Sequence, residues 1–312
     1  MPTGTMMGIH FEALKEVCPV NRSNDKISSR VKTTLGSRID FVGWALALPL
    51  LVFLAFTFFY PLLYTFLLSL QNDTNTGLTL KNYSQFLMTS DGQKILSLTL
   101  LLSIASTFLS VLLSLPLSMV LRKRFFGKSF VQFLMLVPAL IPSLVGALGL
   151  LILYDQTGWV NYFLVRVIHV ASTPISIDYT IPGIILFYVW MFFPYGGLVI
   201  LSGLQSIDPA IEEAGRVFGA NPIGVFWRII LPLLRPSLMA GSILIFLQAF
   251  GAFSIPLIAG GNYQPLAVRI FTVATVFLQW PSASAMAVIM GIIQIILVVL
   301  FRKAQSGKGV SQ

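Results

Sequence analysis

Residues 181–204 read IPGIILFYVWMFFPYGGLVILSGL and contain no Asp, Glu, Lys, Arg or His. A helix of about 20 apolar residues is long enough to cross the hydrocarbon core of a bilayer, so this stretch predicts a transmembrane helix. Five more long stretches are free of the same residue types, namely Phe41–Leu70, Ile95–Leu121, Phe130–Tyr154, Ser237–Ile258 and Ser284–Phe301. The sequence therefore predicts an all-α membrane protein with six transmembrane helices.

The composition excludes several other classes of protein. Hydrophobic residues make up 56% of the chain and charged residues 10%, whereas soluble domains carry about 25% charged residues. A soluble enzyme is excluded, and so is a disordered chain, which would be poor in apolar residues. The net charge is +9, but the basic residues lie in short clusters between apolar runs, which argues against a nucleic-acid groove. The single cysteine, Cys18, allows neither an intrachain disulfide nor a Cys-based metal site.

The distribution of Lys and Arg predicts the orientation. Residues 1–40 hold six of them, residues 122–128 four, residues 205–235 three and the C-terminal end three, whereas the opposite side has only four. Since basic residues near span ends are retained in the cytoplasm, both termini are predicted to be cytoplasmic. The predicted organisation is a cytoplasmic tail at 1–40, a transmembrane domain at 41–302 and a second cytoplasmic tail at 303–312.

Two connections on the outer side are less regular. Asp155–Thr180 alternates aromatic and polar residues at roughly helical spacing, which fits either a short interfacial helix or a loop packed on its neighbours. Gly260–Pro281 contains an apolar stretch, residues 266–278, that is too short to cross a membrane. This second connection is predicted to be a shallow or re-entrant segment.

The cytoplasmic connection 205–235 carries explicit helix signals. Asp208 followed by Pro209 is a helix start, because the carboxylate can accept from free backbone N–H groups and proline suits the first helical position. Gly219 is a natural helix stop. Asn221 and Pro222 repeat the start signal, and Pro232 is expected to end the second helix. The segment is therefore predicted to be two short helices joined by a tight bend, forming either a docking knob or a simple helical linker.

This segment resembles a known motif. Glu213-Ala214-Gly215, three residues, Gly219, nine residues and Ile229-Ile230-Leu231-Pro232 are similar to the EAA motif of the permease subunits of binding-protein-dependent type I ABC importers. Gly215 departs from the second alanine that the family usually has. The stretches Phe250–Ser254, Pro256 and Gly260–Gly261 resemble the branch that serves polyamines, ferric iron and phosphonates.

The resemblance implies a division of labour among subunits in the bacterial cytoplasmic (inner) membrane. Two cytoplasmic ATPase subunits would bind ATP and Mg, a second and related permease subunit would complete the pathway, and an extracytoplasmic binding protein would deliver the solute. The segment 208–218 would be the coupling helix that enters a groove of the ATPase. The residues that the resemblance assigns to coupling are Asp208, Glu212, Glu213, Ala214, Gly215, Gly219, Ile229, Leu231 and Pro232.

No catalytic motif, cofactor site or metal site is predicted for this chain. Residues 127–129 read Gly-Lys-Ser, but Arg122 replaces the glycine that a phosphate-binding loop requires, so ATP hydrolysis falls to a partner. His10 and His169 are predicted on opposite sides of the membrane, which leaves no paired histidine site.

The translocation pathway is less sharply indicated. Gln248 and Gln294 are amides deep within predicted spans, where an unpaired amide costs several kcal/mol, and with Ser254 they are candidates for lining the pathway. Ser103, Ser106, Thr107, Ser110 and Ser114 recur at helical spacing, a pattern that favours close helix packing over a water-lined path. The alternative function is an ion-coupled secondary transporter or channel. The spans lack the ionisable residues that proton relays use, although sodium could be held by backbone oxygens.

Overall fold

The computed structural model describes residues 22–72, 77–170 and 172–306, and its regular elements are helices. The chain divides into two units, Met1–Tyr64 and Thr65–Gln312. The long helices are α1 (Arg22–Ser69), α3 (Ser90–Arg122), α7 (Ile181–Ser206), α10 (Leu231–Phe250) and α13 (Trp280–Ser306). The shorter ones are α2 (Lys81–Met88), α4 (Lys128–Leu140), α5 (Ser143–Tyr154), α6 (Trp159–Tyr162), α8 (Pro209–Val217), α9 (Pro222–Val225), α11 (Ser254–Ala259) and α12 (Leu266–Thr275). Two π-helical turns are η1 (Phe163–Val167) and η2 (Phe226–Ile230).

Six helical segments of the described chain are long and apolar enough to cross a membrane, which confirms the predicted fold class. They are Leu46–Ser69, Ser90–Arg122, Ser143–Val167, Ile181–Ser206, Pro222–Phe250 and Trp280–Lys303. Residues 22–40 of the predicted N-terminal tail belong to α1, and residues 303–306 continue α13. The rest of the two predicted tails, 1–21 and 307–312, lies outside the described residues.

The third predicted span, Phe130–Tyr154, is wrong as one continuous helix. The chain breaks at Ile141 and Pro142 into α4 and α5, and the spanning segment is Ser143–Val167 instead. Ile141 is extended, with φ −81° and ψ 130°, which is the conformation that a following proline imposes. An uncharged stretch can thus contain a helix break that hydropathy alone does not reveal.

The fifth predicted span, Ser237–Ile258, is also shifted. Its helix begins at Pro222, passes through η2 and α10, and ends at Phe250, so Pro232 does not end a helix as predicted. The backbone N–H of Leu231 donates to the carbonyl of Phe226, a bond five residues back that widens the turn just before the proline. The wider turn lets one helix run from the connection 205–235 into the apolar segment that follows.

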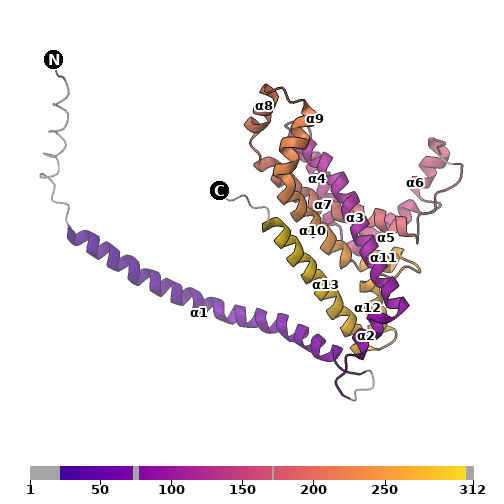
Figure 1. Ribbon diagram of the computed structural model, residues 1–312, viewed down its shortest axis with the longest axis horizontal. Helices are drawn as coiled ribbons and strands as arrows, with labels where there is room; N and C mark the ends of the chain where they lie inside the picture. The colour runs from indigo at the N-terminus through magenta and orange to yellow at the C-terminus, as the bar shows by residue number, and fades with distance from the viewer. Residues whose placement is uncertain (1–21, 73–76, 171, 307–312) are drawn as a thin grey trace. The chain divides into compact units, whose positions relative to one another are not determined.

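Helices α3, α7 and α10 pack against one another and form the centre of the second unit (Figure 1). The serine face of α3 is fully buried here, and the Ser114 and Ser118 hydroxyls donate to the carbonyls of Phe193 and Gly197 on α7, at 3.0 and 3.1 Å. Close packing, rather than a water-lined path, is therefore the role of this face. Between α7 and α10, a Cβ on Gly241 would lie 3.1 Å from the carbonyl oxygen of Gly196.

The two irregular connections are partly helical. Trp159–Val167 forms α6 and η1, which project from the end of α5 (Figure 1). The Asn161 amide donates to the carbonyl of Ile175 and accepts from its N–H, at 3.0 and 2.8 Å, so the following loop folds back on the short helix. The connection thus contains a short helix and a loop that packs on it, and its helical residues belong to the candidate span Ser143–Val167. In 260–281, α12 has ten residues and is too short to cross a bilayer.

Candidate functional site

The connection 205–235 folds as two capped helices. Asp208 Oδ1 accepts from the N–H of Ala210 at 2.9 Å, and Asn221 Oδ1 accepts from the N–H of Gly224 at 2.6 Å. A proline follows each cap at the first helical position. Each side-chain oxygen thereby satisfies a backbone donor that the helix start leaves free. We name α8, Gly219 and α9 the coupling segment.

Gly219 makes the bend between the two helices. Its φ is +85°, in the left-handed region that disfavours residues with a Cβ. The N–H of Ala220 donates to the carbonyl of Gly215 at 3.1 Å and the N–H of Gly219 to that of Arg216 at 2.9 Å. This hydrogen-bonded closure satisfies the last carbonyls of α8 and holds the bend in one geometry.

The residues expected to take part in coupling divide into an outer and an inner set. Glu213, Ala214 and Gly219 are exposed, whereas Gly215 faces η2, where a Cβ on it would lie 2.6 Å from Cδ1 of Ile229. Gly215 therefore serves packing within the chain. Ile229, Leu231 and Pro232 are half-buried, and they continue from η2 into the first turn of α10.

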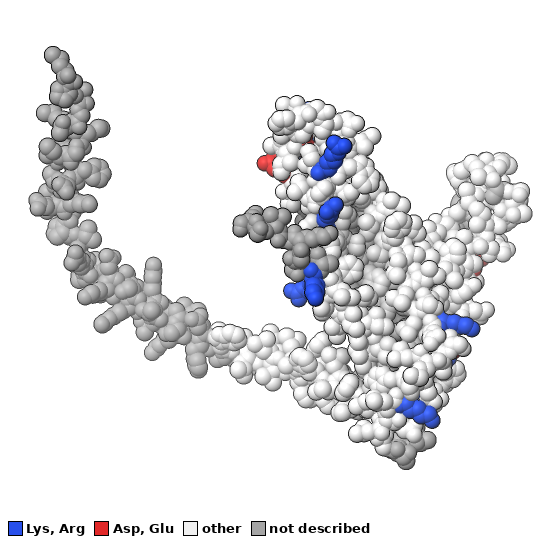
Figure 2. All heavy atoms as spheres, viewed as in Figure 1, with Lys and Arg blue, Asp and Glu red and all other residues white. Residues whose placement is uncertain are grey.

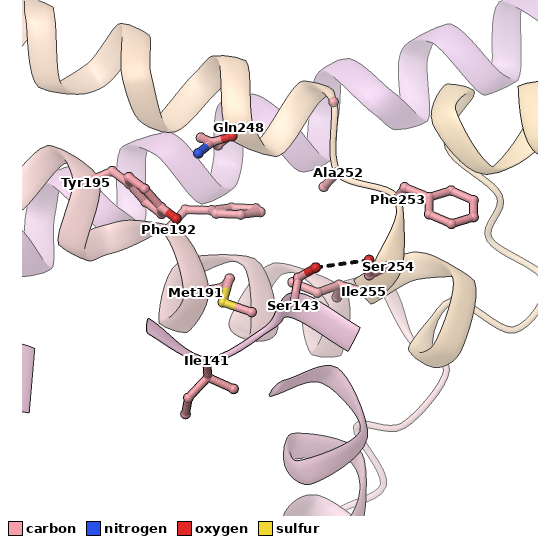
Figure 3. A pocket seen from close by; sticks show the side chains of 11 residues that line it. Ile141, Ser143, Met191, Phe192, Tyr195, Gln248, Ala252, Phe253, Ser254 and Ile255 are labelled. Atoms are coloured by element: carbon pink, nitrogen blue, oxygen red, sulfur yellow. Dashed lines mark hydrogen bonds between the residues drawn. The ribbon is translucent and has the colours of Figure 1, made fainter. Parts of the chain in front are cut away.

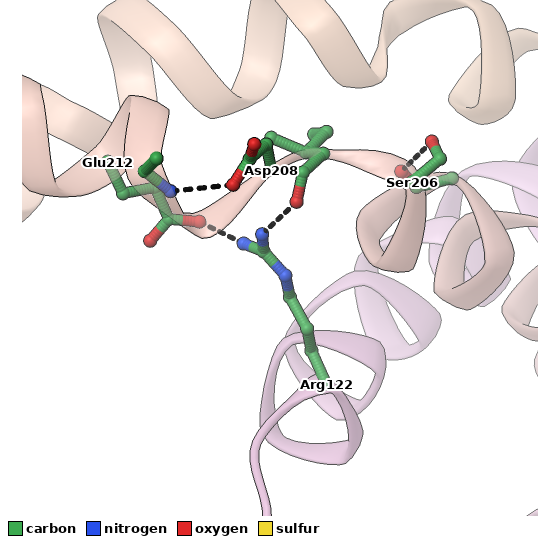
Figure 4. Close-up of polar contacts among 7 residues, drawn as sticks. Arg122, Ser206, Asp208 and Glu212 are labelled. Carbon is green, nitrogen blue, oxygen red and sulfur yellow. Dashed lines mark hydrogen bonds and ion pairs between the residues drawn. The ribbon is translucent and has the colours of Figure 1, made fainter.

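Glu212 faces the transmembrane bundle. Its Oε1 accepts from Nη1 of Arg122, the last residue of α3, and Nη2 of Arg122 donates to the carbonyl of Ile207 at 2.7 Å (Figure 4). The charge pattern predicted only a topological role for Arg122, and this pair was not predicted. No local signal predicts it, because the two residues lie 90 positions apart.

The tip of α8 is apolar and exposed, which the sequence analysis also missed. Val217 and Phe218 are 85% and 90% exposed. Both follow the last charged residue of α8, Arg216, at the bend. Two adjacent apolar side chains with this much exposure at the end of a capped helix are typical of a protein-binding surface.

A cavity of about 410 Å³ lies where α5, α7, α10 and α11 meet. Gln248 on α10, Tyr195 and Met191 on α7, and Ser143 on α5 all line it together with Ser254 (Figure 3). The Ser143 hydroxyl donates to Oγ of Ser254 at 3.0 Å. The described lining residues carry hydroxyl, amide, aromatic, aliphatic and thioether groups and no formal charge; we name this space the central cavity.

The structure brings two of the three predicted pathway residues together. Gln248 and Ser254 both line the central cavity, whereas Gln294 of α13 is absent from its lining. Gln294 lies instead behind Gly251, where a Cβ on the glycine would be 3.5 Å from the Gln294 Nε2. The chain leaves α10 at Gly251–Phe253, and α11 then packs on α5 and α7, which places Ser254 in the same cavity as Gln248.

Charged groups lie near the two ends of the second unit. Figure 2 shows basic side chains at the end that carries α8 and α9, and others at the opposite end. At that opposite end Arg269 pairs with Asp91 at 3.2 Å. Burial raises the pKa of Asp178 in the loop before α7, and the neighbouring carboxylate of Asp155 raises it further.

Comparison with known proteins identifies the family. Residues 110–306 match the model of the family described as binding-protein-dependent transport system inner membrane component. The spermidine/putrescine transport system permease protein PotB of Escherichia coli (strain K12) is 30% identical over 173 residues, which cover 55% of this chain and 62% of PotB. The trehalose/maltose transport system permease protein MalF of Thermococcus litoralis is 28% identical over 231 residues, which cover 71% of this chain and 77% of MalF. The chain thus spans about three fifths of PotB.

Solved structures show the same fold. A bacterial ABC transporter involved in the import of the acidic polysaccharide alginate has a chain that superposes with a TM-score of 0.75 at 15% identity, covering 88% of this chain and 99% of that one. The alginate transporter in complex with a pentasaccharide-bound periplasmic protein superposes with a TM-score of 0.72.

The family match favours a permease over the ion-coupled secondary transporter or channel. The capped coupling segment lies within the matched residues, as do α7, α10 and the central cavity. This chain belongs to the family of inner membrane components of binding-protein-dependent transport systems.

Proposed function

We propose that this chain is the permease subunit of an ATP-driven importer and works with two ATPase subunits, a second permease subunit and a binding protein. The observation that carries the proposal is the capped, exposed coupling segment within a chain of this family. The segment offers a rigid surface on which another protein can act. ATP and Mg would be bound by the ATPase subunits, and this chain would convert their closure into movement of its helices.

The outer face of α8 is the proposed contact with an ATPase subunit. Phe218 and Val217 supply an apolar anchor, and large exposed side chains of this kind dominate binding energies at interfaces. Glu213 is exposed and free to meet basic groups of the groove, whereas Glu212 is engaged by Arg122. We therefore assign the polar contact with the ATPase to Glu213.

The coupling segment is connected to the central cavity by continuous structure. α9, η2 and α10 form one helical run from Pro222 to Phe250, and Gln248 lies near its end. Gly215 packs on Ile229 within this run, so a displacement of α8 is transmitted to α10. Binding of ATP at a distance can thus favour one of two arrangements around the cavity, which is the behaviour required of alternating access.

We propose the central cavity as this subunit's part of the translocation pathway. Its amide and hydroxyl groups can exchange hydrogen bonds with a passing solute, and the uncharged lining would hold no ion tightly. A second, related permease subunit would close the open side. Since PotB and the putative ferric transport system permease protein FbpB 1 of Haemophilus influenzae are both relatives, we propose a small solute of the polyamine or ferric-iron branch.

Copurification tests the subunit assignment. The tagged chain, coexpressed with a candidate ABC ATPase subunit from the same organism, is expected to retain that ATPase in detergent. An ATPase that is expressed and folded but never copurifies would contradict the proposal.

Uptake by two variants tests the pathway. Gln248→Leu is expected to lower the uptake rate while basal ATP hydrolysis is retained, because the amide lines the cavity. Gln294→Leu is the matched control, since Gln294 lies outside that lining and its replacement leaves the cavity unchanged. Equal uptake rates for the two variants would show that Gln248 is not part of the translocation pathway.

A further inference from the structure

Arg122 connects three elements at the base of the coupling segment. It is the last residue of α3, its Nη1 donates to Glu212 in the first turn of α8, and its Nη2 donates to the carbonyl of Ile207, which follows the last residue of α7 (Figure 4). One guanidinium therefore joins the ends of α3 and α7 to the start of α8.

The environment favours a strong and specific connection. The side chains of Arg122 and Glu212 are only 17% and 18% exposed, so water screens them less than a surface pair. The carbonyl of Ile207 is at the negative end of the α7 dipole, which favours a cation there. Arginine can serve both acceptors at once because its planar guanidinium presents several donors in a fixed geometry, which lysine does not.

Apolar packing at this place joins α3 to α9 and η2, and the described cluster contains no residue of α8. A cavity of about 220 Å³ lies beside the ion pair and is lined by Leu204, Pro209, Ile230 and the paired residues themselves. The most extensive contacts of α8 with neighbouring helices are made with α9 and η2. Without Arg122, a push on α8 would reach the bundle through α9, η2 and the covalent link to α7, while α3 would receive it only indirectly.

We infer that Arg122 is a positioning residue for energy coupling, which transmits movement of α8 directly to α3 by holding Glu212 and the Ile207 carbonyl together. This inference rests on the proposed function, because it assumes that α8 is the element on which the ATPase acts. Arg122, a basic residue at a span end, would thus have a mechanical role in addition to its contribution to topology.

The test compares transported solute per ATP hydrolysed in the reconstituted transporter complex. For Arg122→Gln we expect this ratio to fall about tenfold, the factor that corresponds to the loss of a charge-assisted hydrogen bond, with unchanged copurification of the ATPase. Glu212→Gln should cause a similar fall, and the double variant should be little worse than either single one. Lys123→Gln is the matched control, because Lys123 is the adjacent basic residue and lines the same cavity.

If the Arg122→Gln variant does not assemble into the transporter complex, the Arg122→Lys variant tests the inference instead. The lysine retains the charge but cannot serve both acceptors, so we expect an assembled complex with a coupling ratio between those of wild type and a fully uncoupled variant. A wild-type ratio in assembled Arg122→Lys or Arg122→Gln would overturn the inference. A wild-type complex that shows no ATP-driven uptake would instead overturn the proposed function itself.

Discussion

Gly215 and Ile229 contact each other so closely that a Cβ on the glycine would lie 2.6 Å from Cδ1 of the isoleucine. The contact joins α8 to η2, and it explains why a glycine is compatible with the position where the family usually has alanine. Since Cδ1 is the end of a flexible side chain, a single methyl group can be accommodated by rotation of Ile229. A larger side chain cannot, and it would separate α8 from η2.

The first prediction concerns this contact. Gly215→Ala should change the free energy of unfolding by less than about 1 kcal/mol, because the gain in helix propensity offsets the local crowding. Gly215→Leu should be destabilising by about 1–3 kcal/mol through overpacking and should lower ATP-driven uptake. Thermal unfolding and uptake measured on both variants check this, and a Gly215→Leu variant that matches wild type in both would contradict the packing role.

The bend at Gly219 gives the second prediction. A β-branched residue at a φ of +85° is strained by about 1–3 kcal/mol, so Gly219→Val should remain inserted but lose the coupling of ATP hydrolysis to uptake. Gly219→Asn is the control, since asparagine tolerates the left-handed region. No atom lies within 4 Å of a Cβ at this position, so Asn should retain coupling. Normal uptake by well-expressed Gly219→Val would argue against the bend as part of the coupling device.

The third prediction concerns the apolar tip of α8. Phe218→Ser should weaken binding of the ATPase subunit about tenfold or more, because a large side chain that is 90% exposed would lose its pocket in the partner. Phe126→Ser is the matched control, because Phe126 is fully exposed in the turn between α3 and α4 and is predicted on the same side of the membrane. Titration of the ATPase onto each detergent-solubilised variant measures the affinities; equal values would exclude Phe218 from the interface.

The fourth prediction concerns orientation. The charge distribution places the turn 123–127 in the cytoplasm and the start of α3 outside. A topology reporter fused after Gly92 should therefore read as external, and one fused after Phe126 as internal. The reverse pattern would overturn the assignment of the cytoplasmic side, and with it the placement of the coupling segment.

The fifth prediction concerns pH. Burial and the neighbouring Asp155 raise the pKa of Asp178, so its ionised form destabilises the fold at pH values above that raised pKa. The penalty disappears as the pH falls below the unfolded pKa of about 3.9, where both states are protonated. Asp178→Asn should thus raise the melting temperature at neutral pH and have little effect near pH 4. Asp91→Asn, which removes the partner of Arg269, should give no such gain.

The local features of the coupling segment could be predicted from the sequence. The caps Asp208 and Asn221, and the left-handed Gly219, depend on residues a few positions apart. Six spans could be predicted in the same way, because apolar length is a local property. Pro142 is the sequence signal for the break at Ile141–Pro142, whereas the bounds of the third span were wrong because hydropathy does not register backbone geometry.

The remaining features depend on tertiary structure. Arg122 meets Glu212, and Ser143 meets Ser254, only because the helices bring distant segments together. The helical run through Pro232 depends on the π-helical turn η2, which no local residue pattern predicted. The division of the coupling residues into an outer and an inner set likewise depends on the packing of Gly215 on Ile229, which is a tertiary contact.

Uptake into proteoliposomes shows whether this chain transports solute only as part of an ATP-driven complex. The chain is reconstituted with its ATPase, its second permease subunit and its binding protein, and solute accumulation is measured with and without ATP. We expect accumulation that requires ATP and the complete complex, and none from this chain alone under any ion gradient. Uptake by the purified chain alone, driven by a proton or sodium gradient, would contradict it.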